Sequence, residues 1–370
     1  MTTCWNQRGI ALVAALAIAA VLLPVGAFVV MQCRTDFLIG HHLRAETEAF
    51  YVAEAGLAHA LSEVKPITAI GPILAGPDHV AHTADDGIFP FSGGPPGPFP
   101  YAPFRYDVRV TDSGGGKLRI QSTSSGRQGS TKQVEALVRQ APHVFTPAAL
   151  HAVSDVSGID MGQVGFQLSG LDHQASGMLG GPADPLPALT STDAATVLWL
   201  QQHLTALAAQ RLDGVGGAPS LGTATEFDLP SFIQSVLARP DGARFSSLVA
   251  PPNFVLGTTA APQITIVAGD LRVPATLTGC GVLVIQGLWQ VAGTVEFAGV
   301  VIVTGGIIFE PTSTVRLLGA VWRGPTSDPR VQLFGAGMLA YSSAALDLVD
   351  AALPGLLPHA VQVVGWREQL

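Results

Sequence analysis

The sequence predicts an α+β chain, mostly β, with a long N-terminal transmembrane and stem helix. A small antiparallel sheet and then a parallel β-solenoid with a helical insertion follow. Three observations predict this class. Residues 10–31 form one uncharged, mostly apolar run, long enough to cross a membrane as a helix. Apolar and polar residues alternate in two segments of 104–123, as in half-buried strands. Apolar runs led by Gly281, Gly299 and Gly319 recur at about 20 residues, as in solenoids.

The composition excludes several classes of protein. The 370 residues carry 19 basic and 27 acidic side chains, a formal net charge of −8, and no run of Lys or Arg. This balance argues against nucleic-acid binding. Hydrophobic residues make up 48%, which argues against a disordered chain. Three cysteines without a CxxC spacing, Cys4, Cys33 and Cys280, exclude a disulfide scaffold and a zinc ribbon. We expect Cys33 and Cys280 to be unpaired thiols.

The apolar run at 10–31 predicts a membrane helix. At a rise of about 1.5 Å per residue it would be about 33 Å long, against a hydrocarbon core of about 30 Å. Arg8 precedes the run, which favours a cytoplasmic N-terminus and places the bulk of the chain on the far side. The run is longer than the apolar region of a cleavable secretory signal, about 7–15 residues. A plain signal anchor fits this hydropathy equally well.

The helical pattern continues beyond the apolar run. Phe50, Ala53, Leu57 and Leu61 recur at spacings of three and four residues and form one stripe of an amphipathic helix. The helix then covers 10–64 and ends before a proline. We expect the four stripe residues to form a stem that packs against copies of the chain or against other partners.

Two sequence boxes in this region resemble a known family. Gln7-Arg8-Gly9 stands before the apolar run, and AFYVAEAGL occupies 49–57; together they resemble the start of PilX-type type IV pilus assembly proteins. The resemblance implies that a prepilin peptidase removes leader residues 1–9 by cutting between Gly9 and Ile10, and that Ile10 is then N-methylated. It implies a minor pilin in the inner membrane, single pass with its bulk outside the cytoplasm, and later in a filament or at the cell surface. Its partners would be other pilins or pseudopilins, the peptidase and the inner membrane.

One position departs from the family pattern. Most pilins carry Glu at the fifth residue after the cut, where this chain has Ala14. In this it is similar to the K-type pseudopilin of type II secretion, which implies a place at the filament tip or in assembly initiation. A type IV pilus and a secretion filament both stay open. The alternative function is an unprocessed, membrane-anchored β-solenoid adhesin or carbohydrate-active enzyme.

A connector and an antiparallel meander follow the helix. Residues 65–103 are rich in Pro and Gly and predict a surface connector. In the meander at 104–140, SGGG at 113–116 supplies a hairpin turn. The segment VEALVR fits either a strand or a helix, and the meander context favours a strand.

The solenoid is expected over 141–343, with glycines at its corners. Residues 264–273 would form the rung that precedes the clear repeats, and 151–173 an earlier, divergent rung. Apolar residues at helical spacing predict a helical insertion at about 190–240. We expect 344–370 to cap the last rung, because open solenoid ends need protection.

On the rung that begins at Gly299, alternation decides which side chains enter the core. We expect either Val300 and Ile302 or Val301 and Val303 to point inward.

Candidate catalytic and ligand-binding residues are sparse. Glu296 and Glu310 are the acidic residues within 281–324, and no pair of carboxylates is fixed on neighbouring rungs, as glycosidic cleavage needs. His79 and His82 lie at a metal-ligand spacing beside several aspartates, yet such side chains in a Gly/Pro-rich loop are more often solvated. We therefore expect no enzyme activity, no metal and no cofactor.

Overall fold

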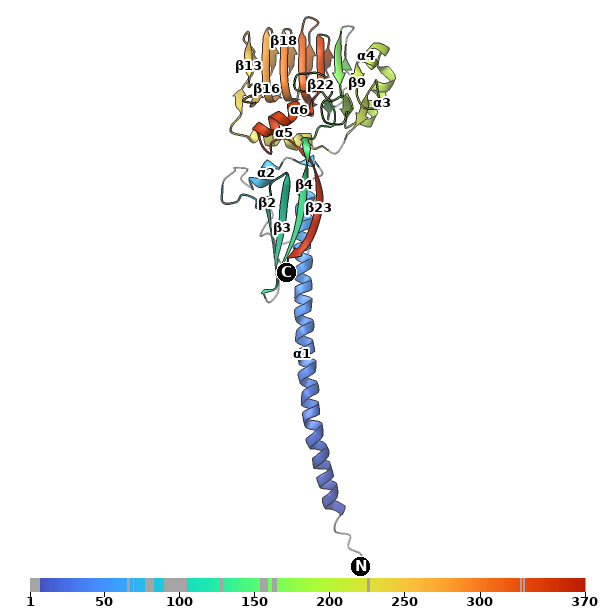
Figure 1. The fold of residues 1–370 in the computed structure, drawn as a ribbon, viewed down its shortest axis with the longest axis vertical. Coiled ribbons are helices and arrows are strands. Elements are labelled where there is room, and N and C mark those ends of the chain that lie inside the picture. The colour runs from blue at the N-terminus through green and yellow to red at the C-terminus, as the bar shows by residue number, and fades with distance from the viewer. Residues whose placement is uncertain are drawn as a thin grey trace, which may run out of the picture.

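The computed structural model describes residues 7–64, 67–68, 70–76, 83–89, 105–126, 129–153, 159–161, 165–224, 227–326, 328 and 330–369. Figure 1 shows an elongated molecule with a long helix at one end, a small sheet in the middle and a β-solenoid at the other end. The predicted fold class is confirmed.

Helix α1 (Gln7–Glu63) is one continuous element of 57 residues. At about 1.5 Å per residue it is about 86 Å long. Pro24 lies inside it without ending it. Its first part projects away from the rest of the molecule, and its last turns lie along the sheet (Figure 1).

The stem sheet has five antiparallel strands in the order β1-β23-β4-β3-β2. They are β1 (Ile67–Thr68), β23 (His359–Gln369), β4 (Thr131–Val144), β3 (Lys117–Ser125) and β2 (Arg105–Asp112). Short helix α2 (Gly71–Leu74) lies in the segment that leads to β2. Buried and exposed side chains alternate along β2 and β3, so the predicted hairpin is confirmed. VEALVR belongs to strand β4.

The C-terminal segment corrects the expectation of a solenoid cap over 344–370. Helix α6 (Ser343–Ala352) packs against the solenoid, but β23 leaves it and pairs with β4 in the stem sheet. Arg367 stands opposite Glu135 in that pairing, and Trp366 stands opposite Ala136. Strand β23 therefore extends the sheet on which α1 packs instead of covering a solenoid end.

The solenoid stacks parallel strands into two sheets. Its regular rungs contain β14 (Gln263–Val267), β15 (Leu271–Val273), β16 (Thr276–Ile285), β17 (Trp289–Val291), β18 (Thr294–Val303), β19 (Ile307–Phe309), β20 (Thr314–Arg323), β21 (Val331–Leu333) and β22 (Ala336–Tyr341). The rung at the starting edge contains β11 (Ala243–Phe245), β12 (Leu248–Val249) and β13 (Phe254–Leu256). The expected rung at 264–273 corresponds to β14 and β15.

Glycines turn the corner inside each long strand. Gly281, Gly299 and Gly319 are register neighbours in β16, β18 and β20. Their φ angles are 136°, 125° and 129°, which L side chains rarely adopt. A Cβ atom on Gly299 would lie 2.1 Å from the carbonyl oxygen of Gly281. The corners therefore require glycine for its backbone angle and because the neighbouring rung is so close.

The earlier rung occupies an unexpected place. Strands β5 (Leu150–Ala152), β6 (Ile159–Asp160) and β7 (Phe166–Ser169) pair with β20, β21 and β22. The first rung in sequence thus stacks on the last one. Strands β8 (Leu189–Ser191), β9 (Leu212–Asp213) and β10 (Leu221–Thr223) extend this end further. This stacking matches the stem sheet, where β4, which enters the solenoid, and β23, which leaves it, are neighbours.

The helical insertion consists of three helices, α3 (Ala194–His203), α4 (Ala206–Gln210) and α5 (Leu229–Ala238). Asp193 begins α3 by accepting hydrogen bonds from the backbone N–H groups of Ala195 and Thr196, a typical N-cap. Helix α5 lies between β10 at one end of the solenoid and β11 at the other. It therefore carries the chain back along the stack.

Over 300–303 both alternations of β18 are buried, the set that faces the interior of the coil and the other one alike. Val300, Val301, Ile302 and Val303 are each at most 1% exposed. One set faces the interior of the coil, and helices cover the other side. Helix α6 packs against β18 and β20, and Phe232 of α5 lies 5.3 Å from Trp322 of β20 between ring centroids. This outer cover explains why the strands read as continuous apolar runs.

Candidate functional site: the exposed half of helix α1

The first half of α1 presents apolar side chains to the surroundings on every side. All its described side chains from position 12 to 44 are exposed. The large ones include Leu12, Leu16, Leu22, Leu23, Phe28 and Met31, each more than 60% exposed. The most apolar 18-residue window has a mean hydropathy of 2.7, and within the described residues α1 is the one helix long and apolar enough to cross a membrane. Water does not favour such a surface, so this half requires lipid or protein around it.

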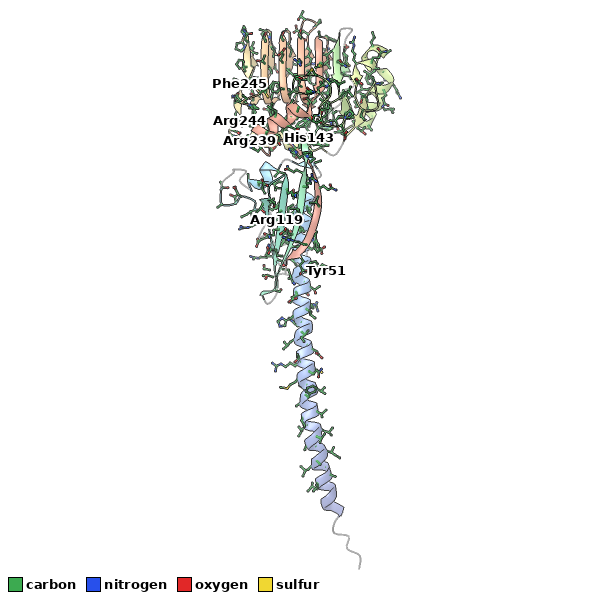
Figure 2. All side chains as sticks on the ribbon, viewed as in Figure 1. Tyr51, Arg119, His143, Arg239, Arg244 and Phe245 are labelled. Atoms are coloured by element: carbon green, nitrogen blue, oxygen red, sulfur yellow. The ribbon has the colours of Figure 1, made fainter. Side chains whose placement is uncertain are left out.

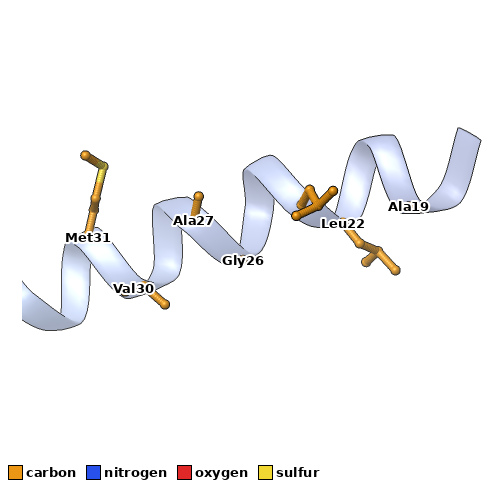
Figure 3. Close-up of a pocket in the computed structure, with 7 residues that line it drawn as sticks. Ala19, Leu22, Gly26, Ala27, Val30 and Met31 are labelled. Atoms are coloured by element: carbon orange, nitrogen blue, oxygen red, sulfur yellow. The ribbon is translucent and has the colours of Figure 1, made fainter. Parts of the chain in front are cut away.

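A shallow apolar depression lies on one side of this half. Figure 3 shows its lining residues, which include Leu22, Gly26, Val30 and Met31. Apart from its chain neighbours and the backbone of its own helix, no described atom lies within 4 Å of the place where a Cβ on Gly26 would stand. The missing side chain leaves the helix backbone open to close approach, as small residues do in membrane helices.

Charged residues begin after the apolar run. Arg34 and Asp36 follow Cys33, and Arg44 donates a hydrogen bond from Nε to Glu48 at 2.9 Å. Exposed Phe37 lies among these charges. This stretch is therefore suited to a boundary between lipid and water and to contact with a second protein surface.

The predicted stem stripe of α1 is buried within the chain itself. Ala53 is fully buried and Leu57 is 2% exposed, while Phe50 and Leu61 are partly buried against the same core. They pack on strands β2, β3 and β4. The expectation that this stripe packs against copies or partners is wrong, because the chain's own stem sheet covers it.

Close contacts fix the helix on that sheet. Gly56 lies so near β2 and β3 that a Cβ would approach the Ser122 hydroxyl to 2.5 Å and the Tyr106 ring to 2.7 Å. His59 Nδ1 lies 2.9 Å from the Tyr106 hydroxyl, and burial raises the pKa of Tyr106. Figure 2 shows Tyr51 where α1 leaves the sheet, and its side chain is exposed.

The remaining sequence-predicted residues are not brought together. Gly9 and Ile10 lie in the first turns of α1, and Ala14 is exposed further along it. Exposed Cys33 and buried Cys280 are both free thiols. Glu310 accepts a hydrogen bond from the Gln290 amide at 2.7 Å, which ties two neighbouring rungs.

The candidate metal ligands His79 and His82 lie outside the residues that the structure describes, and so does leader residue Cys4. Within the described ranges, no group of three or more His, Cys, Asp or Glu side chains is placed to hold a metal ion.

Comparison with known proteins gives a remote similarity among solved structures. No family model matches the sequence, and no similar curated protein was found. Among solved structures, the chain is similar to the crystal structure of the competence-associated pilin ComZ from Thermus thermophilus, with 11% identity and a TM-score of 0.26. The match covers 88% of this chain and 98% of that one. A TM-score this low assigns neither fold nor function.

Proposed function

We propose that the chain is a minor pilin-like subunit, of the PilX type, in a type IV pilus or a related secretion filament. One observation carries this proposal. Helix α1 is exposed and apolar over its first half, while its second half packs on an antiparallel sheet of the same chain. One element thus serves as membrane anchor and as the support of a folded unit outside the membrane.

The length of α1 fits both tasks. Its exposed residues 12–44 span about 50 Å at about 1.5 Å per residue, and about 30 Å suffices to cross the hydrocarbon core. About 20 Å of helix then separates the membrane from the stem sheet. The solenoid lies at the opposite end of the sheet (Figure 1) and is held away from the membrane.

Processing and partners complete the proposal. A prepilin peptidase removes residues 1–9 between Gly9 and Ile10, and Ile10 is N-methylated. The mature chain resides in the inner membrane with its bulk outside the cytoplasm, and then joins other pilins or pseudopilins in a filament. Ala14, in place of the usual Glu, favours a role at the tip or in assembly initiation.

The N-terminus of the protein in its native cells tests this proposal. Intact mass and N-terminal sequencing of membrane-extracted protein are expected to show a chain that begins at methylated Ile10. A Gly9→Leu variant should retain the leader and migrate as a longer precursor. Gly40→Leu is the matched control, because it makes the same change in an open part of α1 and should be processed normally.

An intact start at Met1 in the unmodified protein contradicts the proposal. It favours instead the unprocessed, membrane-anchored adhesin or carbohydrate-active enzyme.

A further inference from the structure

Two histidine–aspartate pairs join the stem sheet to the solenoid. Asp347 and Asp350 are three residues apart on α6, so they lie on one face of that helix. Asp347 Oδ2 lies 2.6 Å from His143 Nδ1 on β4, and Asp350 Oδ2 lies 3.1 Å from His359 Nε2 on β23. Figure 2 shows His143 at the narrow junction between the two units.

The backbone crosses this junction twice, and the crossings are close together. The N–H of Phe145, just after β4, donates to the carbonyl oxygen of Pro358, just before β23, at 2.7 Å. Helix α6 packs on β18 and β20 on one side and against β4 on the other. The two carboxylates of α6 therefore fasten the solenoid to both strands that enter the stem sheet.

His359 has acceptors at both ring nitrogens. Its Nδ1 lies 3.0 Å from the carbonyl oxygen of Ala141, and its Nε2 faces the Asp350 carboxylate. A neutral imidazole donates from one nitrogen only. Both contacts can be hydrogen bonds at the same time when the ring is the imidazolium cation, which carries a proton on each nitrogen. The His359 side chain is 8% exposed, so water does not readily replace either contact.

His143 differs in this respect. Its Nδ1 contacts Asp347, and a neutral ring protonated at Nδ1 keeps that hydrogen bond. Asp347 also accepts from the backbone N–H of Val144 at 3.3 Å. This pair therefore survives loss of one proton, whereas a neutral His359 keeps only one of its two hydrogen bonds, either to Asp350 or to Ala141.

Asp350 depends on the His359 proton. Its side chain is 24% exposed, and its Oδ1 atom is buried without a hydrogen-bond partner among the described residues. When His359 is neutral with its proton on Nδ1, a lone pair of Nε2 faces the carboxylate. A partly buried negative charge then has no donor from the ring, which disfavours the closed arrangement.

We propose that His359 and Asp350 form a proton-operated joint that fixes the solenoid on the stem sheet at acidic pH and loosens as the pH rises. The charged groups around His359 are Asp350 and Asp347 on α6, and Asp112 and Arg139, which line the same cavity from the β2 and β4 side. Because three carboxylates and one guanidinium surround the ring, their net negative charge favours the protonated, cationic form of His359.

The direction of the pH dependence follows from the surroundings of the ring. Burial lowers the pKa of His359, but the hydrogen bond and the charge of Asp350, the hydrogen bond to Ala141 and the charge of Asp347 together outweigh it, so the pKa lies above its ordinary value. A raised pKa means that the contribution to stability is fully present below the unfolded value of about 6.5. It is lost as the pH rises through the folded value.

Distance measurement between the two units tests the joint. Spin labels are placed at exposed Thr123 on β3 and exposed Arg272 on β15, in the full chain in detergent micelles with Cys4 and Cys33 changed to serine. Double electron–electron resonance is recorded from about pH 5.5 to about pH 9, a range that includes the ordinary histidine pKa of about 6.5. We expect one narrow distance distribution at the acidic end and a broad one at the alkaline end.

Asp350→Asn gives the sharper result, because the dependence on pH should disappear. The Asn amide donates to Nε2 of a neutral His359 and, turned over, accepts from Nε2–H of the cation, while Nδ1 donates to Ala141 in both states, so the distribution should stay narrow from acidic to alkaline pH. Asp241→Asn is the matched control, since Asp241 pairs with Arg239 on the solenoid surface, and it should behave as the unmodified chain.

Three outcomes overturn the proposal. They are a distribution in the unmodified chain that does not change with pH, an Asp350→Asn variant that follows the unmodified course, and loss of far-ultraviolet circular dichroism at the same pH as the broadening.

Discussion

Both halves of helix α1 carry an apolar surface, but the two surfaces differ in what covers them. The first half carries large side chains on all sides, and these are exposed. The second half buries one stripe of mostly small residues, including Ala45, Ala49, Ala53 and Ala60. Small side chains let the helix axis approach the sheet closely. An apolar surface around the whole helix thus indicates an external partner, while a stripe indicates a partner within the fold.

A similar contrast separates the inner and outer faces of the solenoid. A coil with one solvated face should tolerate a charge at every second position of β18. Over 300–303 helices cover the outer face as well, so neither alternation is solvated there, while Glu296 in the first part of β18 is exposed.

The largest effect is expected from charges introduced beneath the helices that cover the outer face of β18. Val300→Asp and Val301→Asp should each lower the free energy of unfolding by several kcal/mol, because each places an unpaired charge in a dry environment. Chemical unfolding of the full chain in micelles measures this. Thr314→Asp, at an exposed position on β20, is the control and should change little. A large effect at one of the two valines alone would mean that one face of β18 is solvated.

A smaller difference in the free energy of unfolding is expected between substitutions in the two halves of α1. Leu57→Ala removes a side chain that is 2% exposed in the stem core and should cost about 2–5 kcal/mol in the free energy of unfolding. Leu22→Ala makes the same change where the side chain is exposed, and its effect should lie within about 0.5 kcal/mol. Equal costs for the two variants would refute the division of α1 into an externally and an internally covered half.

The sequence predicted correctly those elements that depend on interactions between residues close together in the chain. The apolar run at 10–31, the alternation in β2 and β3, and the glycine corners each reflect a backbone or a burial period within a few residues. Periodicity identifies which face of an element is buried, and for these elements that is enough to predict the type of structure and its position in the sequence.

What the sequence did not predict is pairing between distant segments. Strand β23 meets β4 more than 200 residues away in the sequence, and β5 stacks on β20 at a separation of 171 residues. The stripe with Leu57 was recognised, but its partner was not, because a period carries no information about which surface covers it. The junction of His359 with Asp350 was missed for the same reason: its two acceptors come from β4 and α6.

The last expectation concerns the place of the subunit in a filament. After α1, about 300 residues remain, and a globule of that size has a radius of gyration of about 19 Å. Packed helices lie only about 8–10 Å apart, so successive copies would collide unless each distal unit were held outward. By the family resemblance, the missing Glu would attract the N-terminal amine of a preceding subunit. A first or tip subunit has no such partner, so Ala14 leaves no amine unpaired in lipid.

Quantitative mass spectrometry of sheared filaments tests this position. The chain should be rare relative to the major subunit, and antibody labels should mark filament ends. Ala14→Glu restores the missing carboxylate and should modestly raise the share of the chain in filaments without changing its folding. Ala15→Glu introduces the same charge one position on, which turns it by about 100° around the helix, and should not. Near-equal abundance in the unmodified strain, or labels along the whole shaft, would contradict a tip position.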